Sequence, residues 1–105
     1  MDFGVKLKAF RKDRGETLHM VAMGTNIDST LLSKFERGVR LPTDEQVQRL
    51  AGYFGIDKGQ MAAETTAGRI LFEYGSSDVT YKAVMYVQEI IEKNYIENAS
   101  GGKND

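Results

Sequence analysis

The chain has 105 residues, a net charge of −1, no cysteine and a single histidine, His19. This length suits one domain, with room for a helical appendage. Without cysteine the chain forms no disulfide and no thiolate metal site, and one histidine cannot make a histidine cluster for metal binding or nucleophilic catalysis.

The hydrophobic pattern argues against a membrane or secreted protein. The longest run of apolar residues, 83–87, is far shorter than the ~20 residues that a membrane-spanning helix needs. The first residues, MDFGVKLKAF, lack the apolar stretch of a secretory signal. We therefore expect a cytoplasmic protein with no membrane partner, no metal and no cofactor.

The net charge hides an uneven distribution along the chain. Residues 5–43 contain eight basic and four acidic residues, whereas residues 44–105 contain six basic and ten acidic ones. A basic part followed by an acidic part indicates either one face that binds an anion or an ordinary solvated charge distribution. Charge alone leaves these two interpretations equally open.

Apolar residues recur at helical spacing, and no segment shows the period of a strand, which predicts an all-α fold. The first predicted helix has an apolar face that starts at Phe3, and it ends at Gly15. Thr17 is the expected N-cap of a second short helix that ends near Gly24. A tight turn is expected at residues 24–26.

The third and fourth helices are bounded by clear capping signals. Asp28 is the expected N-cap of a third helix over residues 29–37, with Gly38 as the residue that ends it. Residues 43–46 (TDEQ) form a capping box that opens a fourth helix, and this helix continues to Gly55.

Two further helices are predicted before a polar tail. A weaker capping box at residues 57–60 opens a fifth helix towards Glu73. Ser77 or Asp78 caps a sixth helix with one apolar face. The Gly-rich tail, residues 99–105, is predicted to be disordered.

Residues 17–38 carry the strongest functional signal. Two short helices joined by a turn containing glycine make a helix-turn-helix, whose second helix can lie in the major groove of DNA. The second of these helices is expected to cross close to position 22, where only a small side chain such as that of Ala22 fits. Ile27 and Leu32 are expected to be buried at this crossing. The outward positions of that helix are all polar: Ser29, Thr30, Ser33 and Lys34.

Four segments follow one another in a recognisable order: KLKAFRKDRG, TLHMVAMGTNID, LLSKFERGVRLPT and DEQVQRLAGYFGID. Together they resemble the lambda-repressor-like (Xre/Cro-type) helix-turn-helix regulators over about residues 3–57. The most specific part of the resemblance is the run LSKFERG followed by R-x-P-T. The resemblance implies a five-helix DNA-binding domain in a cytoplasmic, nucleoid-associated regulator of the bacterial or phage type.

The resemblance also assigns roles to individual positions. It places Ser29, Thr30 and Lys34 where the family reads bases, with Ser33 as a lesser candidate. It implies an ion pair between Arg11 and Glu36. Leu18 differs from the family, which very often has a phosphate-contacting glutamine at this position. Phosphate contacts are implied for Arg11, Thr17, Arg37, Arg40 and Thr43.

The sixth helix allows two interpretations. Its apolar face packs on the fifth helix, or it forms a dimer interface, because a single helix-turn-helix reads only one half-site of an operator. Both interpretations hold together if each helix packs on its own domain and on its partner. The expected interface residues are Ala83, Val84, Val87, Ile90 and Ile91. We divide the chain into a DNA-binding domain over residues 1–74, a dimerisation helix over residues 75–98 and the tail over residues 99–105.

The sequence therefore predicts a transcriptional regulator that binds double-stranded DNA as a homodimer on a palindromic operator. Within the family, a restriction–modification controller or an autorepressor fits the compact chain. The alternative is an antitoxin-type protein, which neutralises a protein partner and autoregulates its operon. An enzyme is not expected, because the chain has no catalytic constellation.

Overall fold

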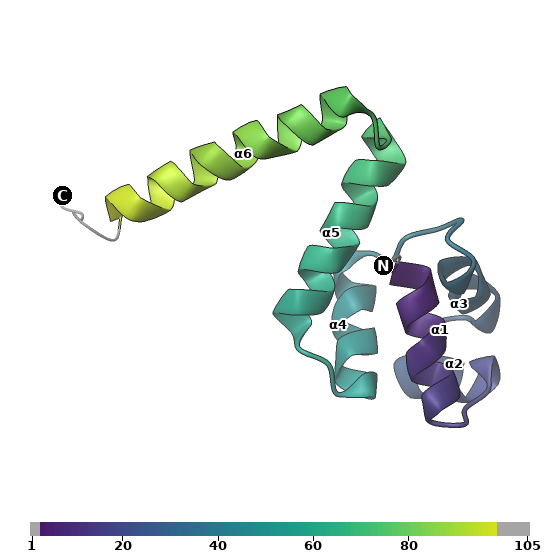
Figure 1. Ribbon diagram of the computed structural model, residues 1–105. Helices are drawn as coiled ribbons and strands as arrows, with labels where there is room; N and C mark the ends of the chain where they lie inside the picture. Colours follow the sequence, from purple (N-terminus) through teal and green to yellow (C-terminus); the bar gives the residue numbers. More distant parts are fainter. Residues whose placement is uncertain (1–2, 99–105) are drawn as a thin grey trace. The chain divides into compact units, whose positions relative to one another are not determined.

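The computed structural model of the protein describes residues 3–98 (Figure 1). Within these residues it contains helices and no strand, which confirms the predicted all-α fold with an added C-terminal helix. The helices are α1 (Phe3–Asp13), α2 (Leu18–Thr25), α3 (Ser29–Glu36), α4 (Asp44–Phe54), α5 (Lys58–Tyr74) and α6 (Asp78–Glu97).

The chain divides into two compact units between Phe72 and Glu73. The first unit contains α1–α4 and most of α5, and the second contains the end of α5 and α6. The predicted division into residues 1–74 and 75–98 stays a prediction, and the predicted disordered tail lies outside the described residues.

The first unit is built around one hydrophobic core. Helix α3 packs against α1 and α2, and α2 also packs against α4 (Figure 1). The predicted crossing residues Ile27 and Leu32 are both buried, as expected, and Ala22 packs against the core. Helix α5 joins this core through Met61. The buried apolar side chains are Phe3, Leu7, Val21, Ile27, Leu32, Phe35, Val47, Leu50, Ala51 and Met61.

Most helix starts follow the predicted capping chemistry. The side chains of Thr17, Asp28 and Ser77 each accept a hydrogen bond from a backbone N–H in the first turn of the following helix. Thr43 forms the complete capping box, since its hydroxyl accepts from the N–H of Gln46 and its own N–H donates to the Gln46 side chain. These caps satisfy donors that a helix N-terminus otherwise leaves unpaired.

Two helix ends differ from the sequence-based expectation. Helix α1 ends at Asp13, because Gly15 has a positive φ of 66° and starts the connection to α2. The expected turn at residues 24–26 is shorter, since Gly24 and Thr25 are still helical. Asn26 is the residue with left-handed backbone, at φ 57°. Asparagine tolerates this conformation better than most side chains do, so glycine is not required there.

Candidate nucleic-acid interface

The connection between α2 and α3 is fixed by hydrogen bonds from both sides. The backbone N–H of Asn26 donates to the carbonyl of Ala22 at 2.9 Å, which ends α2. The carbonyl of Asn26 accepts from the Arg49 guanidinium of α4 at 3.3 Å. The angle between the two helices is therefore held by the turn itself and by a side chain from a third helix.

Helix α3 has one buried face and one polar face. Leu32 and Phe35 are each only 1% exposed, whereas Thr30 is exposed and Ser29, Ser33 and Lys34 are half-buried. Asp28 holds the start of this helix, because its Oδ2 accepts from the N–H of Thr30 at 3.0 Å. The four residues predicted to read bases thus lie on a well-anchored helix and bring only short or flexible polar groups to its surface. Their contacts with DNA stay predictions.

Thr17 lies exposed at the N-terminus of α2. Its Oγ1 accepts from the N–H of Met20 at 3.1 Å, so the hydroxyl proton remains able to donate to another acceptor. The start of a helix carries a partial positive charge and N–H groups that favour an anion. This geometry is compatible with the predicted phosphate contact at Thr17.

The segment between α3 and α4 carries the other predicted phosphate-binding residues. Arg37, Arg40 and Thr43 are all exposed, while Pro42 is fully buried and holds the segment to the core. The carbonyl of Pro42 also accepts from the guanidinium of Arg69 on α5 at 2.6 Å. The two arginines therefore extend from a segment whose backbone is anchored at Pro42.

Arg11 and Glu36 form the ion pair that the resemblance implies. The guanidinium donates twice to the carboxylate, through Nε at 2.7 Å and Nη2 at 2.9 Å, and also to the carbonyl of Glu16 at 2.9 Å. The Arg11 side chain is 12% exposed, and its hydrogen bonds to Glu36 raise the pKa of Arg11 above the ordinary value. The arginine thus ties α1 to α3. The predicted phosphate contact of Arg11 can use only those guanidinium N–H groups that do not donate to Glu36 or to the carbonyl of Glu16.

The residues that match a known protein family lie in the first unit. A family model described as a helix-turn-helix domain matches residues 2–64 of the chain. The protein belongs to the helix-turn-helix domain family. The match confirms the recognition from sequence and is consistent with the lambda-repressor-like resemblance. No curated protein and no solved structure matches the chain. The protein is thus, in the general sense, a DNA-binding regulator.

The helix-turn-helix is braced by a polar cluster that the sequence analysis did not anticipate. The Tyr53 hydroxyl on α4 donates to Glu16 at 2.7 Å, and Arg14 forms an ion pair with Glu16 at 3.2 Å. The hydrogen bond to Glu16 raises the pKa of Tyr53 above the ordinary value. Because Glu16 directly precedes Thr17, this cluster fixes the backbone at the start of α2.

The role of Gly24 was also not predicted from the sequence. A Cβ placed on it would lie 2.1 Å from Cε1 of Tyr53, so α2 and α4 approach each other more closely than any side chain at position 24 allows. The only sequence signal was a glycine in a helical apolar pattern, and a turn was the simpler explanation of it.

The predicted dimer interface lies on α6, and its apolar residues are exposed. Val84, Val87, Ile90 and Ile91 are 45–60% exposed, and Ala83 is exposed as well. Whether a second copy covers them stays a prediction. Within residues 3–98 no three histidine, aspartate or glutamate side chains gather to hold a metal ion. No helix in the same range is long and apolar enough to cross a membrane.

Proposed function

We propose that the protein is a sequence-specific transcriptional regulator that binds double-stranded DNA as a homodimer on a palindromic operator. The observation that carries this proposal is the polar side of α3, anchored by Asp28 and backed by the buried Leu32 and Phe35. A helix with a rigid apolar back and short polar groups in front suits insertion into the major groove.

In this proposal the contacts divide into two groups with different consequences. Lys34 donates to guanine N7 and O6, Thr30 offers a methyl and a hydroxyl to a base edge, and Ser29 and Ser33 supply smaller polar contacts. The phosphate contacts come from Arg11, Thr17, Arg37, Arg40 and Thr43. Ser33 also accepts from Nε of Arg37 at 3.3 Å, which links the two groups.

The homodimer is supported by the apolar side chains that α6 leaves exposed. A two-fold dimer presents two copies of α3 to half-sites about 34 Å apart, and such an arrangement needs a palindromic operator. A restriction–modification controller or an autorepressor would work in this way. The same exposed face also favours the second candidate, an antitoxin-type protein that covers a protein partner with α6.

The proposal is tested by selecting duplexes from a random pool and measuring affinity for the selected site and its single-base variants. Lys34→Ala should cost about 1–3 kcal/mol on the selected site and flatten the preference at one position of each half-site. Arg40→Ala should weaken binding to all duplexes alike and reduce the slope of log affinity against log salt by about one.

Both variants should keep the thermal stability of the parent, because the two side chains take part in none of the core contacts. If the pool yields no enriched sequence, the protein is not a sequence-specific regulator. If Lys34→Ala and Arg40→Ala alter the base preference equally, the division between base-reading and phosphate-binding residues is wrong.

A further inference from the structure

Three residues spaced by seven run along the middle of the apolar face of α6. They are Thr80, Val87 and Asn94, and seven residues make nearly two helical turns, so all three point in almost the same direction. The two outer residues are polar, and Thr80 is buried within its own chain, at 8% exposure. The exposed part of the apolar face is therefore centred on Val87.

The apolar residues beside this line differ in size on the two sides of Val87. Ala83 and Val84 precede it, and the larger Ile90 and Ile91 follow it. If two such helices pair in parallel, Ala83 faces Ala83 and isoleucine faces isoleucine. The contact is then underpacked before Val87 and overpacked after it. If they pair antiparallel, small side chains face large ones along the whole contact, which is how closely packed layers fit together.

We propose that α6 pairs with α6 of a second copy in antiparallel orientation, with the two-fold axis at Val87. This inference rests on the homodimer of the proposed function and specifies its interface. In this register Val87 lies level with Val87 of the second copy, Ala83 lies level with Ile91, and Val84 lies level with Ile90.

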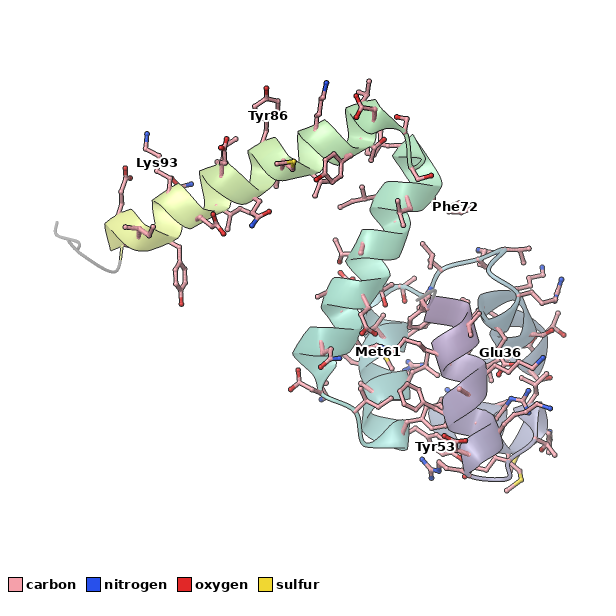
Figure 2. The ribbon with its side chains drawn as sticks, in the orientation of Figure 1. Glu36, Tyr53, Met61, Phe72, Tyr86 and Lys93 are labelled. Carbon is pink, nitrogen blue, oxygen red and sulfur yellow. The ribbon has the colours of Figure 1, made fainter. Side chains whose placement is uncertain are left out.

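The charged residues of α6 do not oppose such a contact. Asp78, Lys82, Glu89, Glu92 and Lys93 lie on the side of the helix away from the Thr80–Val87–Asn94 line, as their spacing from Val87 requires. Glu97 lies at the edge of the apolar face, ten residues from Val87, so its two copies are at opposite ends of an antiparallel pair. Figure 2 shows Tyr86 and Lys93 projecting from one side of α6, which marks the edge of the apolar face. Two copies can therefore meet without bringing like charges together.

Single cysteines test the orientation directly, because the full chain has no cysteine of its own. The variants are Val87→Cys, Ala83→Cys and Ile91→Cys, with Glu89→Cys as an outward-facing control. Each is oxidised alone, and Ala83→Cys is also oxidised in an equimolar mixture with Ile91→Cys. Disulfide-linked dimers are measured by mass spectrometry and by non-reducing gel electrophoresis.

Antiparallel pairing predicts a linked dimer for Val87→Cys and for the mixture, and none for Ala83→Cys, Ile91→Cys or Glu89→Cys alone. In this register two copies of position 83 lie about 12 Å apart along the helices, too far for a disulfide, which needs Cα atoms within about 7 Å. Linked dimers of Ala83→Cys alone and of Ile91→Cys alone would overturn the inference in favour of parallel helices.

Light scattering and DNA binding of the unmodified chain separate this inference from the proposed function. If the chain is a dimer and no variant links, the interface lies elsewhere and only the inference fails. If the chain is a monomer, the inference and the homodimer fail together. If the chain binds no selected duplex, the proposed function fails, and the cysteine pattern still decides the orientation of α6.

Discussion

Gly24 lies in α2 at a point where α4 leaves no space for a side chain. The ring of Tyr53 occupies the position of the missing Cβ, and the hydrogen bond to Glu16 at 2.7 Å holds that ring in place. Gly24→Ala therefore forces α2 and α4 apart or breaks the hydrogen bond. We expect this substitution to lower the free energy of unfolding by about 1–3 kcal/mol in urea denaturation.

Gly52 provides the matched control, because it is also helical and a Cβ placed on it meets no atom within 4 Å. Gly52→Ala should raise the free energy of unfolding by about 0.5–1 kcal/mol, since alanine loses less backbone entropy than glycine on folding. Equal effects of the two substitutions would show that Tyr53 does not pack closely on α2.

The ion pair between Arg11 and Glu36 is largely buried, with the two side chains 12% and 8% exposed. Glu36→Ala leaves the arginine inside the protein without its carboxylate, so it should cost about 3 kcal/mol of unfolding free energy. The control is Glu45→Ala, which breaks the exposed pair with Arg49 and should change stability by about 0.5 kcal/mol or less. A small effect at Glu36, measured by the same denaturation, would mean that the pair is not the link between α1 and α3.

At the scale of the helices, Thr17 combines a structural role with a predicted functional one. Its Oγ1 caps α2, and its hydroxyl proton is available for a phosphate. Thr17→Ala should lower stability by about 1 kcal/mol and also weaken DNA binding. Thr17→Ser keeps the hydroxyl and should retain both properties, measured as the midpoint of thermal unfolding and as affinity for the selected operator. Unchanged binding by a folded Thr17→Ala variant would remove Thr17 from the phosphate contacts.

A structural feature could be predicted from the sequence where the residues that determine it are close together in the chain. The starts of α2, α3, α4 and α6 followed from one capping residue each, because a cap and the N–H that it accepts from are only two or three residues apart. The Arg11–Glu36 pair joins distant residues, and it was found only through the family resemblance. The contacts of Tyr53 with Gly24 and of Arg49 with Asn26 also join residues that are far apart in the sequence. They were not predicted, because no local sequence pattern indicates them.

At the scale of the whole molecule, the uneven charge distribution acquires a physical meaning. The basic part of the chain, residues 5–43, contains most of α1, all of α2 and α3, and the segment with Arg37 and Arg40. The acidic part, residues 44–105, contains α6, whose four acidic and two basic residues give it a net negative charge that the phosphates of DNA would repel. In the proposed regulator the basic part binds the operator, and α6 joins the two copies.

If α6 joins the two copies while the basic part binds DNA, operator affinity should depend on a residue of α6 that does not contact DNA. Val87→Asp places a charge at the centre of the proposed α6 interface, where pairing would bury two like charges against each other. We expect the variant to be a monomer by light scattering, with both units still helical by circular dichroism. Because a monomer engages only one half-site at a time, it should bind the full palindrome at least about tenfold more weakly, by the loss of effective concentration.

Lys93→Asp introduces the same side chain on the outward side of α6 and should leave the mass and the operator affinity unchanged. An isolated half-site gives a second control, since parent and Val87→Asp should bind it alike if α3 and its surroundings are intact. Equally tight binding of the full palindrome by a monomeric Val87→Asp variant would show that each helix-turn-helix binds independently. The exposed face of α6 would then have to serve a different protein, as in the antitoxin-type alternative.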